Sequence, residues 1–364
     1  MVKEYDRKLV LEDGKEYYGY SFGASGERIC EIVFNTSMTG YEEVLTDPSY
    51  TGQAVVMTYP LIGIYGMTGE DSEAEHAGAD ALIVREYEDG RYNFRGMRTL
   101  DDQMKAKKIP GITGIDTREL TRTIRDGGSR KAMITSAGMP LQEALSLLRK
   151  TDLPKDAVSR VSGKEIMVCR PVSERFHVVL IDCGVKKSIV RDLLKKGCRV
   201  SIVPWNTPSS RIDAMSPDGI LISNGPGDPG NVPETVQTVR ELTGRCPILG
   251  ICLGHQILAL AYGARIRKLK FGHHGGNHPV LDLDTGKIGM TAQNHSYAAD
   301  AFSLTDTVLK VTHRNLLDNT VEGVKCERDR AYGIQFHPEG APGPHDQEQL
   351  FDRFMEEMKN ARKT

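Results

Sequence analysis

The alternation of apolar and polar residues divides the chain into two parts with different expected elements. Up to about residue 110, short alternating runs between glycine-rich turns predict mostly β-strands. These expected strands are Lys8–Leu11, Tyr17–Phe22, Arg28–Phe34, Gln53–Thr58 and Ala81–Glu86. Amphipathic helices are expected at Thr117–Arg125 and Leu141–Arg149. A polar, irregular stretch from Thr151 to Pro171 follows, and we interpret it as a linker between two domains.

From Arg175 onwards, apolar runs alternate with amphipathic segments. The runs predict strands at His177–Ile181, Arg199–Val203, Gly219–Ser223 and Pro247–Ile251. The segments between them predict helices at Val185–Lys196, Pro233–Thr243 and after Cys252, then hairpin-like strands after Gly263 and a last helix at Gln347–Lys359. Such alternation predicts an α/β fold, with a doubly wound, mostly parallel sheet in residues 172–364. A β-rich α+β domain is expected before it, in residues 1–171.

Composition narrows the class of protein further. A length of 364 residues suits two domains, and a net charge of -2 gives no electrostatic footprint for nucleic acid or an anionic membrane. No apolar run reaches the ~20 residues that span a bilayer, and the charged N-terminus does not resemble a signal peptide. The seven scattered cysteines contain no C-x-x-C pair, which suits a reducing compartment. We therefore expect a cytoplasmic protein.

Cys252 stands between two glycines at a strand-to-helix junction, in the stretch Gly250-Ile251-Cys252-Leu253-Gly254. This G-x-C-x-G pattern is the thiol counterpart of the G-x-S-x-G nucleophile elbow. The N-terminus of the following helix favours the thiolate, and the N–H of Leu253 is a natural oxyanion donor. The alternative is a small core residue beside glycines that help the helix to pack.

A thiol nucleophile usually works with a histidine base that a third group orients. His337 and Glu339 lie two residues apart in an expected strand end, so both side chains could project to one side around Pro338. They lie 337 − 252 = 85 residues from the cysteine, and only the fold can unite them. An ordinary surface turn is the alternative for this segment.

Three further loops are candidates for binding. The glycine-rich Ser223–Gly230 follows a buried strand and would let backbone approach a ligand, although a plain tight turn fits it equally. Phe271–His278 holds three histidines, but adjacent histidines in a flexible loop rarely converge on one ion, so no metal site is expected. Gln293–Tyr297 could present amide and hydroxyl groups to a polar ligand, or form a hairpin turn.

The elbow, the N-G-P-G-D-P loop and the H-P-E segment together resemble the class I, or triad, glutamine amidotransferases. Other blocks resemble the small subunits of carbamoyl-phosphate synthases, so the resemblance runs nearly end to end. These blocks are Phe34–Tyr41, Thr46–Tyr50, Tyr59–Gly63, Gly114–Arg118, Phe271–Pro279 and Ala341–Asp346.

The resemblance implies a ligase subunit that hydrolyses L-glutamine through a thioester. Cys252 would attack the amide, His337 would protonate the departing ammonia and then activate water, and Glu339 would orient His337. The residues implied to contact glutamine are Ser37, Gly225, Gly227, Leu253, Gln256, Asn294, Ser296 and Tyr297. The N–H groups of Leu253 and of the Gly227 loop would hold the oxyanion.

The resemblance also implies a heterodimer with a large subunit, which would make carbamoyl phosphate from bicarbonate, ATP and channelled ammonia for pyrimidine or arginine biosynthesis. ATP and Mg are expected on that subunit, and no cofactor on this chain. The N-terminal domain would be mainly a docking surface. Three positions depart from the family pattern: Ser296 replaces glycine, Gly340 replaces alanine or serine with little expected effect, and Ile64 replaces asparagine.

Three other functions are compatible with parts of this pattern. A cysteine peptidase or γ-glutamyl hydrolase of related fold would use the same thiol and histidine, but would not need the N-terminal domain or Gln256. An amidotransferase for guanine nucleotides or anthranilate would lack the first ~170 residues as well. A non-catalytic binding module is disfavoured because Cys252, His337 and Glu339 are all present.

Overall fold

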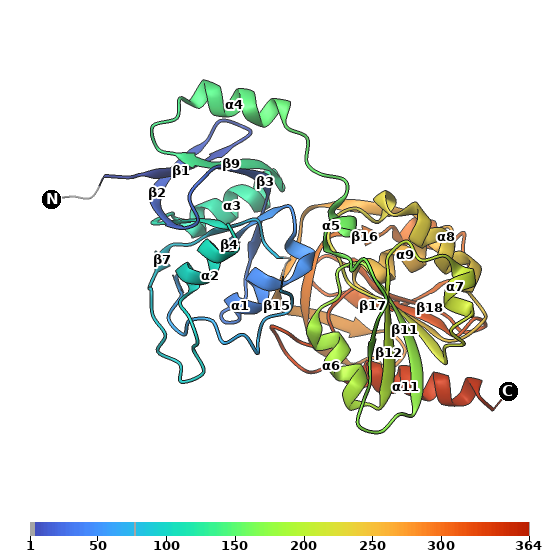
Figure 1. The fold of residues 1–364 in the computed structure, drawn as a ribbon. Coiled ribbons are helices and arrows are strands. Elements are labelled where there is room, and N and C mark those ends of the chain that lie inside the picture. Colours follow the sequence, from blue (N-terminus) through green and yellow to red (C-terminus); the bar gives the residue numbers. More distant parts are fainter. Residues whose placement is uncertain (1–3, 76–77, 364) are drawn as a thin grey trace. The chain divides into compact units, whose positions relative to one another are not determined.

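The computed structural model describes residues 4–75 and 78–363, and the chain divides into two compact units (Figure 1). The first unit ends at Pro154 and also includes Lys270–His274; the second contains Lys155–Leu269 and the chain from Gly275 onwards. The second unit thus begins earlier than the expected residue 172. The reason is that Val158, in the expected linker, is buried in the second unit's core.

The first unit is a closed barrel of seven strands with short helices around it. In barrel order these strands are β1 (Arg7–Leu11), β2 (Glu16–Gly23), β8 (Pro110–Thr113), β6 (Ala81–Ile83), β4 (Gln53–Met57), β3 (Arg28–Asn35) and β9 (Arg130–Ser136). Successive residues of β4 belong to two different apolar clusters, with Val55 in one and Val56 in the other. Both faces of this strand are therefore buried, which explains its continuous apolar sequence.

The remaining elements of the first unit are four helices, a 3-10 turn and a small parallel pair of strands within its described residues. They are α1 (Tyr41–Thr46), η1 (Pro48–Tyr50), α2 (Leu100–Ala106), α3 (Thr117–Gly127), α4 (Leu141–Lys150), β5 (Leu61–Ile62) and β7 (Glu86–Tyr87). The hydrophobic pattern predicts α3 and α4 but misses α1 and α2. The start of α2 is encoded in a cap rather than in periodicity, because the Thr99 hydroxyl accepts the N–H of Asp102.

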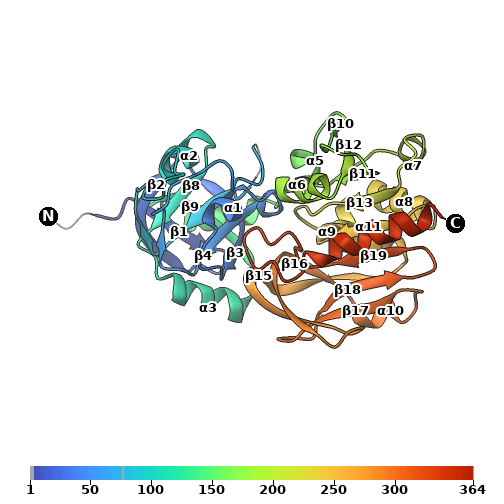
Figure 2. The ribbon, with the colours of Figure 1, turned by 90° about the horizontal axis from the view of Figure 1, so that it is seen from below.

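The second unit is built on a ten-stranded mixed sheet (Figure 2). Its strands, in spatial order, are β10 (Met167–Cys169), β12 (Cys198–Pro204), β11 (Phe176–Asp182), β13 (Gly219–Ile222), β14 (Ile248–Ile251), β19 (Ala331–Ile334), β18 (Val321–Cys326), β17 (Lys310–Asn315), β15 (Ile266–Asp282) and β16 (Ile288–Ala299). The five strands from β12 to β19 are parallel, whereas β10 and the strands from β18 outward add antiparallel pairs.

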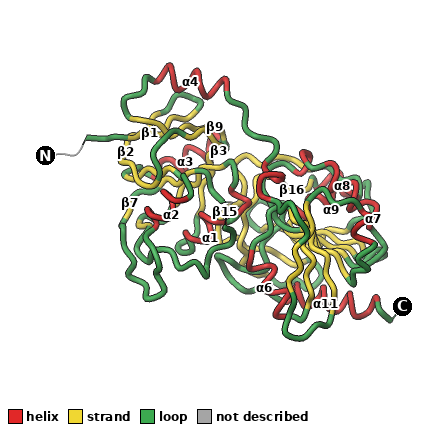
Figure 3. The backbone as a smooth tube through the Cα atoms, viewed as in Figure 1, coloured by secondary structure: helices red, strands yellow, loops and turns green. Residues whose placement is uncertain are grey.

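Helices cover both faces of the parallel strands, as a doubly wound arrangement requires (Figure 3). One face packs against α7 (Ser209–Asp213), α8 (Pro233–Leu242) and α9 (Leu253–Ala261), and the other against α6 (Lys187–Lys195) and α11 (Gln349–Ala361). The short elements of this unit are α5 (Ala157–Val161), η2 (Pro229–Asn231) and α10 (Ala301–Leu304). The mixed α/β architecture is as predicted.

The expected linker is not entirely irregular, because it contains the short helix α5 and the short strand β10. Within it, α5 packs Val158 into the core, and β10 pairs antiparallel with β12. In the described part of the chain, no helix combines the length and the apolar character needed to cross a membrane.

Candidate active site

Cys252 lies between the carboxyl end of β14 and the start of α9, where the chain turns sharply. Its backbone has φ 53° and ψ -103°, a conformation that non-glycine residues rarely adopt. The turn is held by a hydrogen bond of 2.8 Å from the Cys252 N–H to the carbonyl of Ile334. The side chain is 2% exposed. This is the strained elbow that the G-x-C-x-G pattern predicts.

Close backbone packing requires glycine at the two positions that flank Cys252. A Cβ atom at Gly250 would lie 2.5 Å from the carbonyl oxygen of Gly254, and one at Gly254 would lie 2.1 Å from the carbonyl oxygen of Ile222. Both distances are far inside van der Waals contact, so any side chain at either position would displace the backbone of the elbow. A buried structural cysteine would not need this close backbone packing around it.

His337 and Glu339 follow β19, the strand next to β14 in the sheet. The His337 N–H donates to the carbonyl of Ala292 at 2.8 Å, which fixes the backbone. Its Nδ1 lies 2.7 Å from Oε1 of Glu339, and both side chains are buried. The Cys252 thiol is among the groups that raise the pKa of His337, so the fold brings the three predicted residues together.

Lys186 is a member of this cluster that the sequence analysis missed. Its Nζ donates to Glu339 Oε1 at 2.8 Å and also to the carbonyl of Ala341, and only 2% of its side chain is exposed. The sequence predicts Lys186 inside an amphipathic helix, but α6 begins only at the next residue. Asn224 accepts the Lys186 backbone N–H at 3.2 Å and holds the residue in place.

The pKa values of the buried charges follow from their mutual contacts. Burial and the Lys186 charge lower the pKa of His337, but the charge and hydrogen bond of Glu339 and the hydrogen bond with Cys252 together outweigh them and raise the value to about 10. Burial raises the pKa of Glu339, but Lys186 and His337 together hold it well below its usual range. The raised pKa therefore favours the protonated form of His337 at neutral pH, in contact with the Glu339 carboxylate and the Cys252 sulfur.

This coupling predicts how stability varies with pH. Because the folded-state pKa of His337 lies above its unfolded value of about 6.5, its stabilising contribution is complete below that pH and is lost as the pH rises through about 10. The lowered pKa of Glu339 stabilises the fold above about pH 4.3 and is lost only in stronger acid. In Glu339→Gln, His337 lacks its anion and stays neutral in both states. We expect the difference in unfolding free energy between wild type and this variant to narrow from about pH 7 to about pH 10.

Urea denaturation at several pH values checks this expectation. Glu356→Gln, which removes an exposed carboxylate of α11, is the control and should track the wild type throughout. A gap between Glu339→Gln and wild type that stays constant across the range would show that His337 is not the titrating partner.

Several predicted glutamine contacts lie around Cys252 in the second unit. The carbonyl oxygen of Asn294 is 3.5 Å from Cys252 Sγ, and Gln256, on α9, donates to the carbonyl of Tyr297 at 2.8 Å. Leu253 is the first residue of α9, and Ser296 lies in β16 without a positive φ, so a serine fits there.

The glycine-rich loop also packs against this helix start. A Cβ atom at Gly225 would lie 2.1 Å from the carbonyl oxygen of Cys183 and 2.9 Å from Cδ2 of Leu253, and Gly227 has φ +85°. The loop is thus built from glycine by steric need. Ser37 belongs to the first unit, where its N–H donates to Asn35 Oδ1 at 2.7 Å, so its part in binding stays a prediction.

Gly340 corrects one expectation. It was expected to matter little, but it adopts φ +60°, and a Cβ atom there would lie 2.5 Å from the carbonyl oxygen of Pro344. The turn that follows Glu339 in this chain therefore depends on glycine, and the prediction was wrong.

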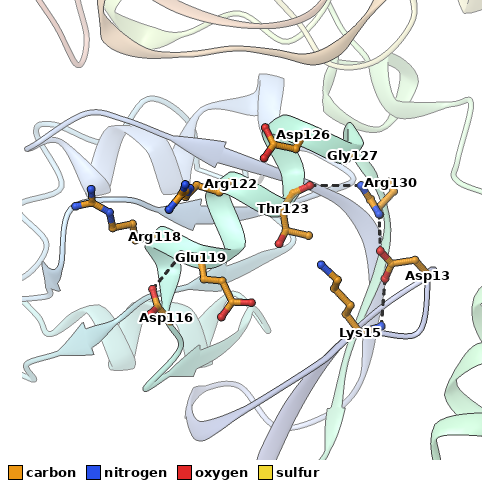
Figure 4. A pocket seen from close by; sticks show the side chains of 10 residues that line it. All are labelled: Asp13, Lys15, Asp116, Arg118, Glu119, Arg122, Thr123, Asp126, Gly127 and Arg130. Carbon is orange, nitrogen blue, oxygen red and sulfur yellow. Dashed lines mark hydrogen bonds and ion pairs between the residues drawn. The ribbon is translucent and has the colours of Figure 1, made fainter.

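The first unit carries a separate polar pocket along α3 (Figure 4). Lys15, Arg122 and Arg130 supply cations there, but Arg130 is paired with Asp13 at 2.6 Å. Asp116 accepts the N–H of Glu119 at 3.0 Å and so caps α3. Acidic and basic groups balance in this pocket, so its charge favours no particular class of ligand.

Comparisons with known proteins find a matching family for each of the two halves of the chain. Residues 179–357 match the family "Glutamine amidotransferase class-I", and residues 9–134 match "Carbamoyl-phosphate synthase small chain, CPSase domain". The carbamoyl phosphate synthase small chain of Listeria innocua is 49% identical, covering 97% of this chain and 96% of the relative. That of Fusobacterium nucleatum is 46% identical, covering 98% and 99%.

A third relative is the carbamoyl phosphate synthase pyrimidine-specific small chain of Bacillus subtilis, which is 45% identical and covers 98% of this chain and 97% of the relative. Identity at this level over nearly the full length of both proteins leaves the family in no doubt. The elbow, its histidine and its carboxylate therefore stand in a chain that belongs to the carbamoyl-phosphate synthase small-chain family, with a class I glutamine amidotransferase domain.

Proposed function

We propose that this chain is the glutamine-hydrolysing subunit of a carbamoyl-phosphate synthase and that Cys252, His337 and Glu339 perform the hydrolysis. The observation that carries the proposal is the buried cluster in which His337 contacts the Glu339 carboxylate and the Cys252 sulfur on its strained elbow. A peptidase or γ-glutamyl hydrolase is not favoured, because residues 9–134 match the small-chain domain, which those enzymes would not need.

The chemistry takes place in two halves. In the first, the Cys252 thiolate, paired with the His337 imidazolium that holds the proton, attacks the side-chain amide carbon of glutamine, and the carbonyl oxygen becomes an oxyanion. The Leu253 N–H at the start of α9 and the N–H groups of the Gly227 loop are the donors that would hold it. The amide C–N bond then breaks as the His337 imidazolium gives its proton to the nitrogen, which leaves as ammonia and yields a thioester.

In the second half, His337 is neutral and accepts a proton from water as the water oxygen attacks the thioester. Collapse of the second oxyanion breaks the C–S bond and releases glutamate, which leaves the sulfur as a thiolate beside the re-formed His337 imidazolium. Glu339 holds His337 Nδ1 throughout, so Nε2 is the nitrogen that moves the proton. The ion pair with Lys186 keeps the Glu339 carboxylate ionised.

The ammonia would serve a large partner subunit that uses ATP and bicarbonate. Free ammonia becomes ammonium in neutral water and loses its nucleophilicity, so transfer through a protected channel is expected. The resemblance implies that the first unit docks that subunit and that Ser37 contacts glutamine.

An affinity label tests the nucleophile directly. Treating the complete two-subunit enzyme with 6-diazo-5-oxo-L-norleucine, a glutamine-like alkylator, should add one label to Cys252, and excess glutamine should prevent it. Synthesis of carbamoyl phosphate from glutamine should then stop, while synthesis from added ammonium salts continues on the large subunit. Peptide mass spectrometry distinguishes Cys252 from the other six cysteines. Label on a different cysteine, or equal loss of both activities, would contradict the proposed function.

A further inference from the structure

The structure assigns Gln335 to the catalytic machinery: we propose that its side-chain amide donates a hydrogen bond to Cys252 Sγ and stabilises the thiolate. This inference rests on Cys252 acting as the nucleophile. Gln335 directly follows β19 and is fully buried. Its Nε2 lies 3.7 Å from Cys252 Sγ, within range of a hydrogen bond to sulfur.

The surrounding groups fix which end of the Gln335 amide faces the sulfur. Nε2 of Gln256 donates to the Tyr297 carbonyl at 2.8 Å, and a carbonyl can only accept. The same Nε2 lies 3.0 Å from Gln335, so the Gln335 atom that faces it must be the oxygen, Oε1. The NH₂ group of Gln335 is thereby turned towards Cys252.

The backbone of Gln335 is also held, because its N–H donates to the Glu322 carbonyl at 2.9 Å in the neighbouring strand β18. The carbonyl of Ile334, the residue immediately before Gln335, accepts the N–H of Cys252 itself. The donor and the nucleophile are therefore tied to each other through main chain as well as side chain, and the donor needs no reorganisation when charge forms on sulfur.

The contacts of Sγ favour different protonation states. The Asn294 carbonyl, at 3.5 Å, can only accept, so it stabilises the protonated thiol. The Gln335 amide can donate, and a hydrogen bond to a charged acceptor is roughly twice as strong as one to a neutral acceptor. The charged groups on this side of the thiol are His337, with Glu339 and Lys186 behind it. Gln335 thus adds a neutral donor that favours the thiolate without altering the ion-pair chain.

The test measures the thiolate rather than turnover. The rate at which iodoacetamide alkylates Cys252 is followed against pH in the full chain, with peptide mass spectrometry to separate it from the other cysteines. Gln335→Met has a similar length but no donor, and we expect alkylation at neutral pH to slow about tenfold and its midpoint to move to higher pH. Gln335→Glu keeps the oxygen facing Gln256 and places a second oxygen against the sulfur, so its shift should be larger.

Tyr332→Phe is the matched control. Tyr332 is buried in β19, three residues before Gln335, and the edge of its ring packs against Phe354 of α11. This variant should reproduce the wild-type profile. Thermal unfolding of each variant shows that it is folded, and the nearly isosteric Gln335→Glu decides the question if Gln335→Met does not fold.

Two results distinguish a failure of the role of Gln335 from a failure of the proposed function. Wild-type alkylation that glutamine prevents, combined with Gln335 variants whose pH profile matches wild type, would overturn the role of Gln335 and leave the proposed function intact. Wild-type Cys252 that reacts no faster than the other cysteines, and that glutamine does not protect, would overturn the proposed function itself.

Discussion

Replacing Cys252 by serine is expected to slow glutamine hydrolysis at least about 10³-fold while the chain still folds. A serine hydroxyl must lose its proton to attack, and the adjacent His337, whose pKa is raised to about 10, already carries a proton at neutral pH and cannot take another. A thiol loses its proton far more readily than a hydroxyl. The fold should persist, since serine occupies the same strained elbow in G-x-S-x-G enzymes.

The measurement is release of ammonia and glutamate by the complete enzyme, together with synthesis of carbamoyl phosphate from ammonium salts, which the substitution should spare. Cys246→Ser is the control, because Cys246 is a partly buried thiol whose pKa burial raises to about 12, and it has no part in the site. Hydrolysis by Cys252→Ser at a rate near that of Cys246→Ser would mean that another group is the nucleophile.

The sequence predicts the strained elbow at Cys252 because the signals for it are local. Glycine is required at positions 250 and 254 because a side chain there would clash with backbone atoms a few residues away or in the adjoining strand. The apolar run before them is a buried parallel strand. The alternation of strands and helices in the second unit is equally legible, because each amphipathic segment must cover one face of the sheet.

What the sequence could not predict depends on contacts between distant segments. Lys186 and Glu339 are 153 positions apart, and a lysine at a helix start is normally solvated, so nothing marks it as buried. The sequence around Gln335 indicates a role for His337 but gives no signal for Gln335 itself. The orientation of the Gln335 amide depends on Gln256 and Tyr297, which lie on other elements. Short helices such as α1 were missed for a different reason, since six residues hold too little periodicity to be recognised.

Removing the charge of Lys186 is expected to have the largest effect on stability of any single substitution at the site. Lys186→Met leaves the Glu339 carboxylate buried beside one cation instead of two, and breaking a buried pair in this way costs about 3–5 kcal/mol of unfolding free energy. Both side chains are almost fully buried, so solvent does not screen the loss. The pKa of Glu339 should rise towards its usual range, and glutamine hydrolysis should slow because His337 loses part of its orienting charge.

Guanidinium denaturation and glutaminase kinetics on the same preparations separate the two consequences. Lys195→Met, which removes a largely exposed lysine of α6 that makes only a surface ion pair with Asp192, is the control and should change the unfolding free energy by no more than about 0.5 kcal/mol. In the double variant Lys186→Met/Glu339→Gln no unpaired carboxylate remains, so part of the lost stability should return although hydrolysis does not. If the double variant instead loses the sum of the two single losses, the two residues are not energetically coupled, and Lys186 does not keep Glu339 charged.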